Sequence, residues 1–262
     1  YHSLKVNTTG ADNVAVGANS LDSNTTGQGN NSIGKNALGV NTTGSYNQAI
    51  GRECLDANTS GEMNVGVGHA SLSDNTTGSR NVAVGFDALN DNTTANNNTG
   101  VGHNALKENT SGTENVAIGA YAADAGSSIS NTVAIGYNAL TNTTNNHNTA
   151  CGSKALEDTT SGSSNVAVGS LSLTDNTTGT SNTAVGFASL RYGTTSSNNT
   201  ALGSGAASNT TGGNNTAVGM QALLTNTSGG DNTVVGSIAL DANTSGARNT
   251  ALGRDSLGAN TT

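Results

Sequence analysis

Carboxylates are the first side chains in this sequence that could do chemistry. They recur shortly after leucines, at Asp22, Asp56, Asp74, Asp91, Glu108, Asp158, Asp175 and Asp241. Carboxylate oxygens and turn carbonyls are calcium ligands, so a ladder of calcium sites is one interpretation. The acids skip repeats and shift position, however, and the chain contains no Gly-Gly-x-Gly-x-Asp nonapeptide. We therefore expect a solvated, repulsive rim that limits aggregation.

Hydroxyl and amide side chains come next, because Asn-Thr-Thr-Gly and close variants recur along the chain. Regular hydroxyl rows make ice binding a hypothesis for Thr8, Thr25, Thr42 and their later equivalents. In turns, however, such hydroxyls bond nearby backbone groups. The same blocks are Asn-x-Thr/Ser acceptors, which would carry glycans if the source is eukaryotic and would be turn residues only in a bacterium or phage. The acceptors in the first half are Asn7, Asn24, Asn41, Asn58, Asn75, Asn92 and Asn109.

A strict internal repeat must position all of these residues. It is marked by a glycine that closes an Ala-Val-Gly-like unit, and twelve of the fourteen intervals between markers are 17 residues and two are 16. The markers are Gly17, Gly34, Gly51, Gly68, Gly85, Gly102, Gly119, Gly136, Gly152, Gly169, Gly186, Gly203, Gly219, Gly236 and Gly253. Two helices need repeats of at least about 33 residues. We therefore predict an all-β fold, a parallel β-solenoid (β-roll) of about fifteen coils, in which residues 1–262 form a single repeat array.

Stacking of coils about 4.8 Å apart would align equivalent residues in columns. The position before the marker glycine is always buriable, as in Val16, Ile33 and Cys151, and the fourth position after it is Leu in 13 of 15 repeats. We predict that these two aliphatic columns form the core. The position two before the glycine is small, with Val234 as the exception. This pattern indicates close approach of another backbone, either from the same coil or from another chain.

The coil spacing also limits what histidine and cysteine can do. His69 and His103 share the position after the marker glycine, but Phe86 separates them, so they lie nearly 10 Å apart, which is too far for one zinc ion. Cys54 and Cys151 lie six coils apart, about 29 Å, whereas disulfide Cα atoms lie within about 7 Å. We expect neither a metal site nor an intrachain disulfide.

Composition and missing motifs exclude several functions. The chain has 9 basic and 17 acidic residues, a net charge of −8, which disfavours nucleic acid and anionic membranes as partners. No apolar run approaches the roughly 18 residues that cross a bilayer, so membrane insertion is not expected. The chain contains no Gly-x-Ser-x-Gly, phosphate loop or His-Glu-x-x-His. We predict that the protein is not an enzyme and needs no cofactor. The few large aliphatic residues per coil favour an oligomer, and we expect a homotrimer.

The units Asn81-Val82-Ala83-Val84-Gly85 and Asn115-Val116-Ala117-Ile118-Gly119 resemble the YadA-like head repeats of trimeric autotransporter adhesins. The resemblance implies a left-handed β-roll, trimerisation through flat faces, and binding to host surfaces or matrix. Family coils are nearer 14 residues, and the extra length here lies in the Asn-Thr-Thr-Gly turn. Asn-Thr-Thr-Gly arrays joined to Ala-Val-Gly-x-x-Ala-Leu units also resemble repeats in phage tail fibres and in long surface proteins of aquatic microbes.

These observations predict an extracellular structural fibre or adhesin segment on a cell surface or virion appendage. Its expected partners are itself, as a homotrimer or an end-to-end polymer, and a host-surface protein or glycan. A self-assembling filament with a purely structural role is the alternative, and an ice-binding solenoid is a more distant one. Candidate recognition residues at variable positions are Phe86, Tyr137, Phe187, Tyr192, His69 and His103, although these rings could instead fill a trimer groove.

Two irregular turns, 120–130 and 191–195, are further candidates, because insertions in solenoids map to turns that sometimes bind. Both ends of the chain break inside a repeat, since Asn260-Thr261-Thr262 has no following Gly. Solenoids need terminal caps to stay soluble. We therefore expect a fragment of a longer array, or subunits that dock end to end.

Overall fold

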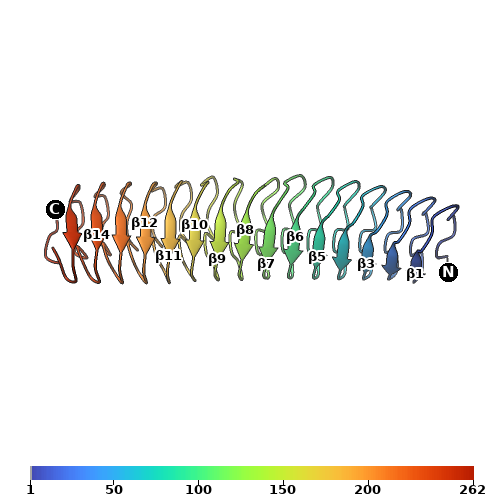
Figure 1. The fold of residues 1–262 in the computed structure, drawn as a ribbon, viewed down its shortest axis with the longest axis horizontal. Helices are drawn as coiled ribbons and strands as arrows, with labels where there is room; N and C mark the ends of the chain where they lie inside the picture. Colours follow the sequence, from blue (N-terminus) through green and yellow to red (C-terminus); the bar gives the residue numbers. More distant parts are fainter. Residues whose placement is uncertain (1) are drawn as a thin grey trace. The chain divides into compact units, whose positions relative to one another are not determined.

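The computed structural model describes residues 2–262, and within that range the secondary structure is β only, with no helix that could span a membrane. Each repeat contributes one three-residue strand (Figure 1). The strands are β1 Val14–Val16, β2 Asn31–Ile33, β3 Gln48–Ile50, β4 Val65–Val67, β5 Val82–Val84, β6 Thr99–Val101, β7 Val116–Ile118, β8 Val133–Ile135, β9 Thr149–Cys151, β10 Val166–Val168, β11 Thr183–Val185, β12 Thr200–Leu202, β13 Thr216–Val218, β14 Thr233–Val235 and β15 Thr250–Leu252. The predicted parallel β-solenoid is confirmed.

The chain forms two compact units, one ending at Asn131 with β1–β7 and one beginning at Thr132 with β8–β15. In each unit the strands pair in parallel and in chain order. Equivalent residues pair, for example Ala15 with Ser32 in the first unit and Ala167 with Ala184 in the second. Each repeat is therefore one coil, and like side chains align in columns.

The core is narrow because small residues line two of its columns. The middle residue of each strand points inward, and the Leu column opposite is fully buried from Leu21 to Leu106. The third residue after each marker glycine is also small, and Ser32 Oγ donates to the Ala37 carbonyl at 2.7 Å within one coil. A Cβ added to Gly66 would lie 2.4 Å from Cys54 Sγ. The backbone that approaches the small column thus belongs to the same chain.

The predicted second core column is wrong. The residue before each marker glycine points outward, so that Val16 is 57% exposed and Ile33 is 42% exposed. The physical reason is the alternation of side chains along a strand: with only the middle of three residues inside, both flanking residues must face out. Both columns are aliphatic in the sequence, so hydrophobicity alone does not show which column points inward and which points outward.

Two ladders of buried asparagines complete the interior. In the first, Asn41 Nδ2 donates to Asn24 Oδ1 of the preceding coil and to the Gly44 carbonyl of its own coil, both at 3.0 Å. In the second, Asn47 Nδ2 donates to Asn30 Oδ1 at 3.2 Å and to the Gly61 carbonyl at 2.8 Å. Buried polar groups without partners are destabilising. Because these amides bond both neighbouring coils and local backbone, asparagine serves as a core residue here.

Each coil also carries residues with left-handed backbone. Leu residues of the core column adopt φ near +50°, as at Leu38 (47°), and Ile238 has φ of 57°. Such values are unfavourable for L-residues and unusual for a β-branched one. Two further left-handed corners flank each strand, two residues before it and three residues after it, for example Arg80 and Asp87 around β5. These corners turn the chain between its sides.

The irregular turns at 120–130 and 191–195 have an explanation inside the coil. In regular coils a Cβ at the turn glycine would collide with both the ladder asparagine and the next coil, since at Gly44 it would lie 2.4 Å from Asn41 Oδ1 and 2.4 Å from the Gly61 carbonyl oxygen. Gly126 and Gly193 replace that asparagine, and a buried Ile129 or Ser196 then replaces the turn glycine. In one coil Ala95 replaces the turn glycine while the ladder asparagine, Asn92, is retained. The hydrogen bond from Asn92 Nδ2 to the Ala95 carbonyl is then 3.3 Å long. Side-chain volume is thus exchanged between two positions three residues apart.

The first ladder should make a large contribution to stability. Asn58→Ala removes a bond to Asn41 and one to the Gly61 carbonyl, and it deprives Asn75 Nδ2 of its acceptor. We expect the free energy of unfolding to fall by roughly 2–4 kcal/mol, because buried partners remain unsatisfied. Urea denaturation measures this. The exposed Thr77→Ala is the control and should change stability by less than about 0.5 kcal/mol. Equal effects of the two changes would contradict the ladder's role.

The volume exchange predicts strong coupling between two residues. Gly126→Asn alone should destabilise by about 1–3 kcal/mol through overpacking against Ile129. Ile129→Gly alone should destabilise by about 2–5 kcal/mol through cavity formation. The double variant restores the regular pair and should recover most of the loss in a double-mutant cycle. Additive losses would show that the two positions do not share one space.

Candidate interaction surface

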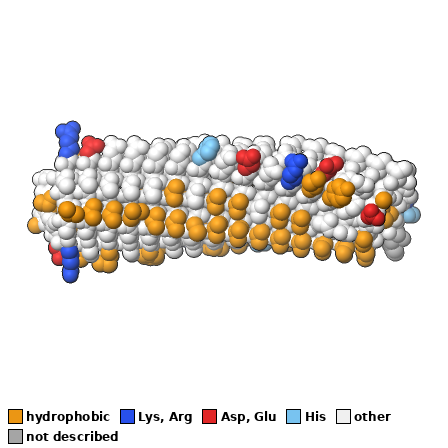
Figure 2. All heavy atoms as spheres, viewed as in Figure 1, with side chains coloured by type: hydrophobic (Ala, Val, Ile, Leu, Met, Phe, Trp, Pro, Cys, Tyr) orange, Lys and Arg blue, Asp and Glu red, His pale blue; other side chains and the backbone are white. Residues whose placement is uncertain are grey.

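The most extended candidate surface is the outer sheet face, defined here as the first and third residues of every strand. The third residues form the aliphatic column, and many of them are more than a third exposed, including Ile50 at 43% and Ile118 at 41%. The first residues are mainly Val and Thr, with Asn31 and Gln48 joined by a 2.6 Å hydrogen bond. Figure 2 shows hydrophobic side chains aligned in rows from coil to coil. In each unit this face thus combines an apolar column of third residues with a mixed column of Val and uncharged polar first residues.

Charge is absent from this face. None of the first or third residues of the fifteen strands is Asp, Glu, Lys or Arg, whereas the whole chain carries a net charge of −8. Soluble monomers rarely expose large contiguous apolar patches, and such patches mark interaction sites. An uncharged face also places no like charges in direct contact when two acidic chains meet there. The outer sheet face is therefore a candidate interaction surface.

Four rings on successive coils form an aromatic ladder, defined as His69, Phe86, His103 and Tyr121. The His69 and Phe86 centroids lie 5.1 Å apart at 9°, and the Phe86 and His103 centroids lie 5.5 Å apart at 19°. Tyr121 meets His103 edge-on at 5.0 Å. Phe86 stands between the two imidazoles, as the sequence spacing predicts. Because both faces of Phe86 are covered, the ladder offers ring edges rather than an open platform.

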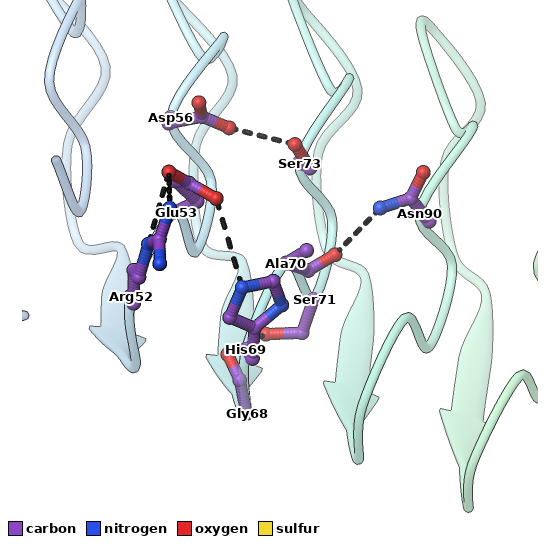
Figure 3. Close-up of polar contacts among 9 residues, drawn as sticks. All are labelled: Arg52, Glu53, Asp56, Gly68, His69, Ala70, Ser71, Ser73 and Asn90. Atoms are coloured by element: carbon purple, nitrogen blue, oxygen red, sulfur yellow. Dashed lines mark hydrogen bonds and ion pairs between the residues drawn. The ribbon is translucent and has the colours of Figure 1, made fainter.

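A small ion-pair network adjoins the ladder (Figure 3). The Glu53 carboxylate lies 2.9 Å from the Arg52 guanidinium and 3.7 Å from His69 Nε2. On the next side of the coil, Ser73 Oγ donates to Asp56 Oδ1 at 2.8 Å, and Asn90 Nδ2 donates to the Ala70 carbonyl at 3.0 Å. The Arg52 side chain is 59% exposed, so this pair contributes little to stability. It places a carboxylate beside His69 at the start of the ladder.

The remaining predicted recognition residues are exposed but scattered. Tyr137 is 52% exposed and Phe187 is 58% exposed, with serines at the equivalent positions of the two intervening coils. Tyr192 is 42% exposed, and the Arg191 guanidinium lies 4.9 Å from its ring centroid. Sequence reasoning missed Tyr46, which is 52% exposed at a left-handed corner. Its position two residues before a strand was the available signal.

The chemistry-bearing residues do not converge. Within residues 2–262 no group of three His, Cys, Asp or Glu side chains could hold a metal ion. Cys54 and Cys151 are both free thiols, and burial raises the pKa of Cys54 to about 11. An open notch of about 420 Å³ lies beside Asp22, Gly39 and Asp56, where the glycine lacks the side chain found in other coils. These features give no catalytic arrangement that we can identify.

The proposed glycan acceptors need a correction. Asn24, Asn41, Asn58, Asn75, Asn92 and Asn109 have no exposed surface, and their amides donate hydrogen bonds inside the coil. A glycan on any of these nitrogens would prevent the ladder from forming, so glycosylation there and the folded coil exclude each other. Asn7 differs, because it is exposed.

The threonine rows divide into two kinds. The first Thr of each block donates its hydroxyl to the carbonyl of the equivalent Thr in the next coil, as Thr42 does to Thr59 at 3.0 Å. The second Thr is exposed, as at Thr43 and Thr77. The first column is thus bonded to the scaffold, although several of its members, such as Thr227 and Thr244, are also exposed.

The chain has no significant match among protein-family models, curated protein sequences or solved structures.

The pKa values of the acidic residues that follow the Leu column predict that stability depends on pH. Burial, and then the charge of Asp74, raise the pKa of Asp91 in the folded state, and burial also raises the pKa values of Asp56, Asp124 and Asp175. Raised carboxyl pKa values mean that the ionised form is penalised in the folded chain. This penalty destabilises the folded chain at pH values above the carboxyl pKa of the folded state. It is relieved as the pH falls through the folded-state pKa toward the lower pKa of the unfolded state.

We therefore expect Asp91→Asn to stabilise the chain at neutral pH by up to about 1 kcal/mol, and to lose this advantage in mildly acidic solution. Thermal unfolding followed across pH measures the effect. Asp12→Asn is the control, at an exposed residue of the first coil. A gain at Asp91 that is independent of pH would contradict the electrostatic explanation.

Proposed function

We propose that this chain is a non-catalytic segment of an extracellular fibre or adhesin, carried on a cell surface or virion appendage, whose copies associate through the outer sheet face. The observation that supports this most directly is the combination of exposed or partly exposed aliphatic residues at the third position of most strands with the absence of charge from both outer positions. Burial of such residues is favourable by about 25 cal/mol for each Å² of apolar surface. Repetition over the strands of a unit gives an extended interface from small individual contributions.

A second copy is the occupant that fits this face best. Rungs of a parallel sheet recur about every 4.8 Å, so a partner that packs against all of them must have the same period. Another copy has that period and presents an equally uncharged surface. Three copies is the number that the resemblance to trimeric adhesin heads implies. The resulting bundle would be a stiff spacer, since each coil bonds both of its neighbours.

Recognition of a host-surface protein or glycan is the second part of the proposal. Aromatic side chains outside the strands, including the aromatic ladder along one border of the outer sheet face and Tyr192 in a turn, give polar and apolar contact groups on a surface otherwise rich in Asn, Thr and Ser. Repetition along a fibre would make weak contacts multivalent. The competing proposals are a filament with a purely structural role and, more distantly, an ice-binding solenoid based on the exposed second threonines.

The association is tested by placing a charge on the outer sheet face. Ile118→Glu should lower the association constant at least about tenfold, because an unpaired carboxylate would be buried between copies. Sedimentation equilibrium over a range of concentrations measures this. Glu108→Gln, which alters an exposed residue on the turn side, is the control. A monomeric unmodified chain, or an oligomer that tolerates Ile118→Glu, contradicts the proposed interface.

The purified chain and its variants can also be used to distinguish the three proposed functions. Binding of the oligomer to a glycan or matrix array, reduced by Phe86→Ala or Tyr192→Ala, supports an adhesin. End-to-end polymerisation without any ligand supports a filament. Thermal hysteresis that is lost with Thr43→Val and Thr77→Val supports ice binding.

A further inference from the structure

The two left-handed corners that flank each strand also flank the outer sheet face. We call the residue two positions before the strand the entry corner and the residue three positions after it the exit corner. Around β5 these are Arg80 and Asp87, with φ of 59° and 52°. Around β15 they are Arg248 and Asp255, with φ of 60° and 55°. Each rung of the face is thus bordered by one residue on either side.

The charged side chains at these corners do not form ion pairs with each other within one copy. In the part of the chain that the structure describes, Arg80, Arg248 and Asp87 make no ion pair, and Asp255 contacts only the exposed Arg254, at 3.3 Å. Arg80, Arg248 and Asp255 are exposed and Asp87 is partly exposed. Their side chains are therefore available to a neighbouring molecule.

Symmetry determines which corners meet. When copies are related by rotation about an axis parallel to the coil stack, the entry corner of one copy lies beside the exit corner of the next, on the same rung. In that alignment Arg80 faces Asp87 and Arg248 faces Asp255. Uncharged corners also match, since Met63 faces Ala70 and Asn97 faces Asn104. A shift of one rung places Arg80 opposite Ala70 or Asn104 and Arg248 opposite Ile238.

We infer that copies of this chain align parallel and without a rung shift, because Arg80 of one copy pairs with Asp87 of the next and Arg248 pairs with Asp255. The inference depends on the proposed association through the outer sheet face, and it adds the residues that select the register. Such residues are needed because a periodic apolar face tolerates slippage by whole rungs. Opposite charges at defined rungs favour one alignment and penalise others, as charged flanking positions do in coiled coils.

Charge reversal tests the pairing. Arg80→Asp and Asp87→Arg each place like charges together across the interface, so each should weaken association about tenfold or more at low salt. The double variant Arg80→Asp/Asp87→Arg re-forms an opposite pair and should associate within about threefold of the unmodified chain. At about 1 M salt, where the Debye length is about 3 Å, the differences should shrink. Sedimentation equilibrium measures all of these association constants.

Asp74→Arg is the matched control for Asp87→Arg, since it changes the net charge by the same amount and sign at an exposed residue away from the face. Circular dichroism and thermal unfolding should show that all variants keep the fold. Single reversals without effect, or a double variant as weak as the singles, overturn the register while leaving the association intact. A chain that stays monomeric in every form overturns the association and the register together.

Discussion

The amide hydrogen bond between asparagines of neighbouring coils is the interaction on which the rest of the structure depends. A chain with 32% hydrophobic residues and only 3% aromatic residues has too little apolar volume for an ordinary core. Asn24, Asn41 and Asn58 fill the interior instead, and each amide bonds the coil before it and a carbonyl of its own coil. These bonds require aligned columns, and the second ladder keeps them across a 16-residue interval, where Asn215 Nδ2 donates to Asn199 Oδ1 at 3.2 Å. Recurrence of asparagine at equivalent positions is therefore a condition of satisfied burial.

That interior determines what remains outside. Small residues at the middle of each strand let the coil close tightly, and the two flanking residues then face solvent. The most hydrophobic side chains of the strands are consequently on the surface, while polar amides are buried. This inversion explains how a chain with a modest aliphatic content presents an extended apolar face. It also leaves the corners as the positions where charge varies without disturbing the ladders.

The sequence predicts the coil, the strand position and the Leu column, because period and β-branched residues report local geometry directly. It does not distinguish Leu38 from Ile33, one buried and one exposed, since both are aliphatic and both recur every coil. The sequence also does not show that the ladder asparagines are buried, because asparagine is usually a turn residue. At the candidate surface, Phe86 and His69 were identifiable from their shared position, but their stacking depends on side-chain orientation. Tyr46 became visible only when the corner geometry was known.

The exchange of volume between Gly126 and Ile129 has a consequence for how such a gene changes length. The compensating residues lie three positions apart, well inside one repeat. Unequal recombination between repeats adds or removes whole seventeen-residue modules, and both halves of the compensation are then inherited together. The compensation within that coil is then preserved in a lengthened or shortened array.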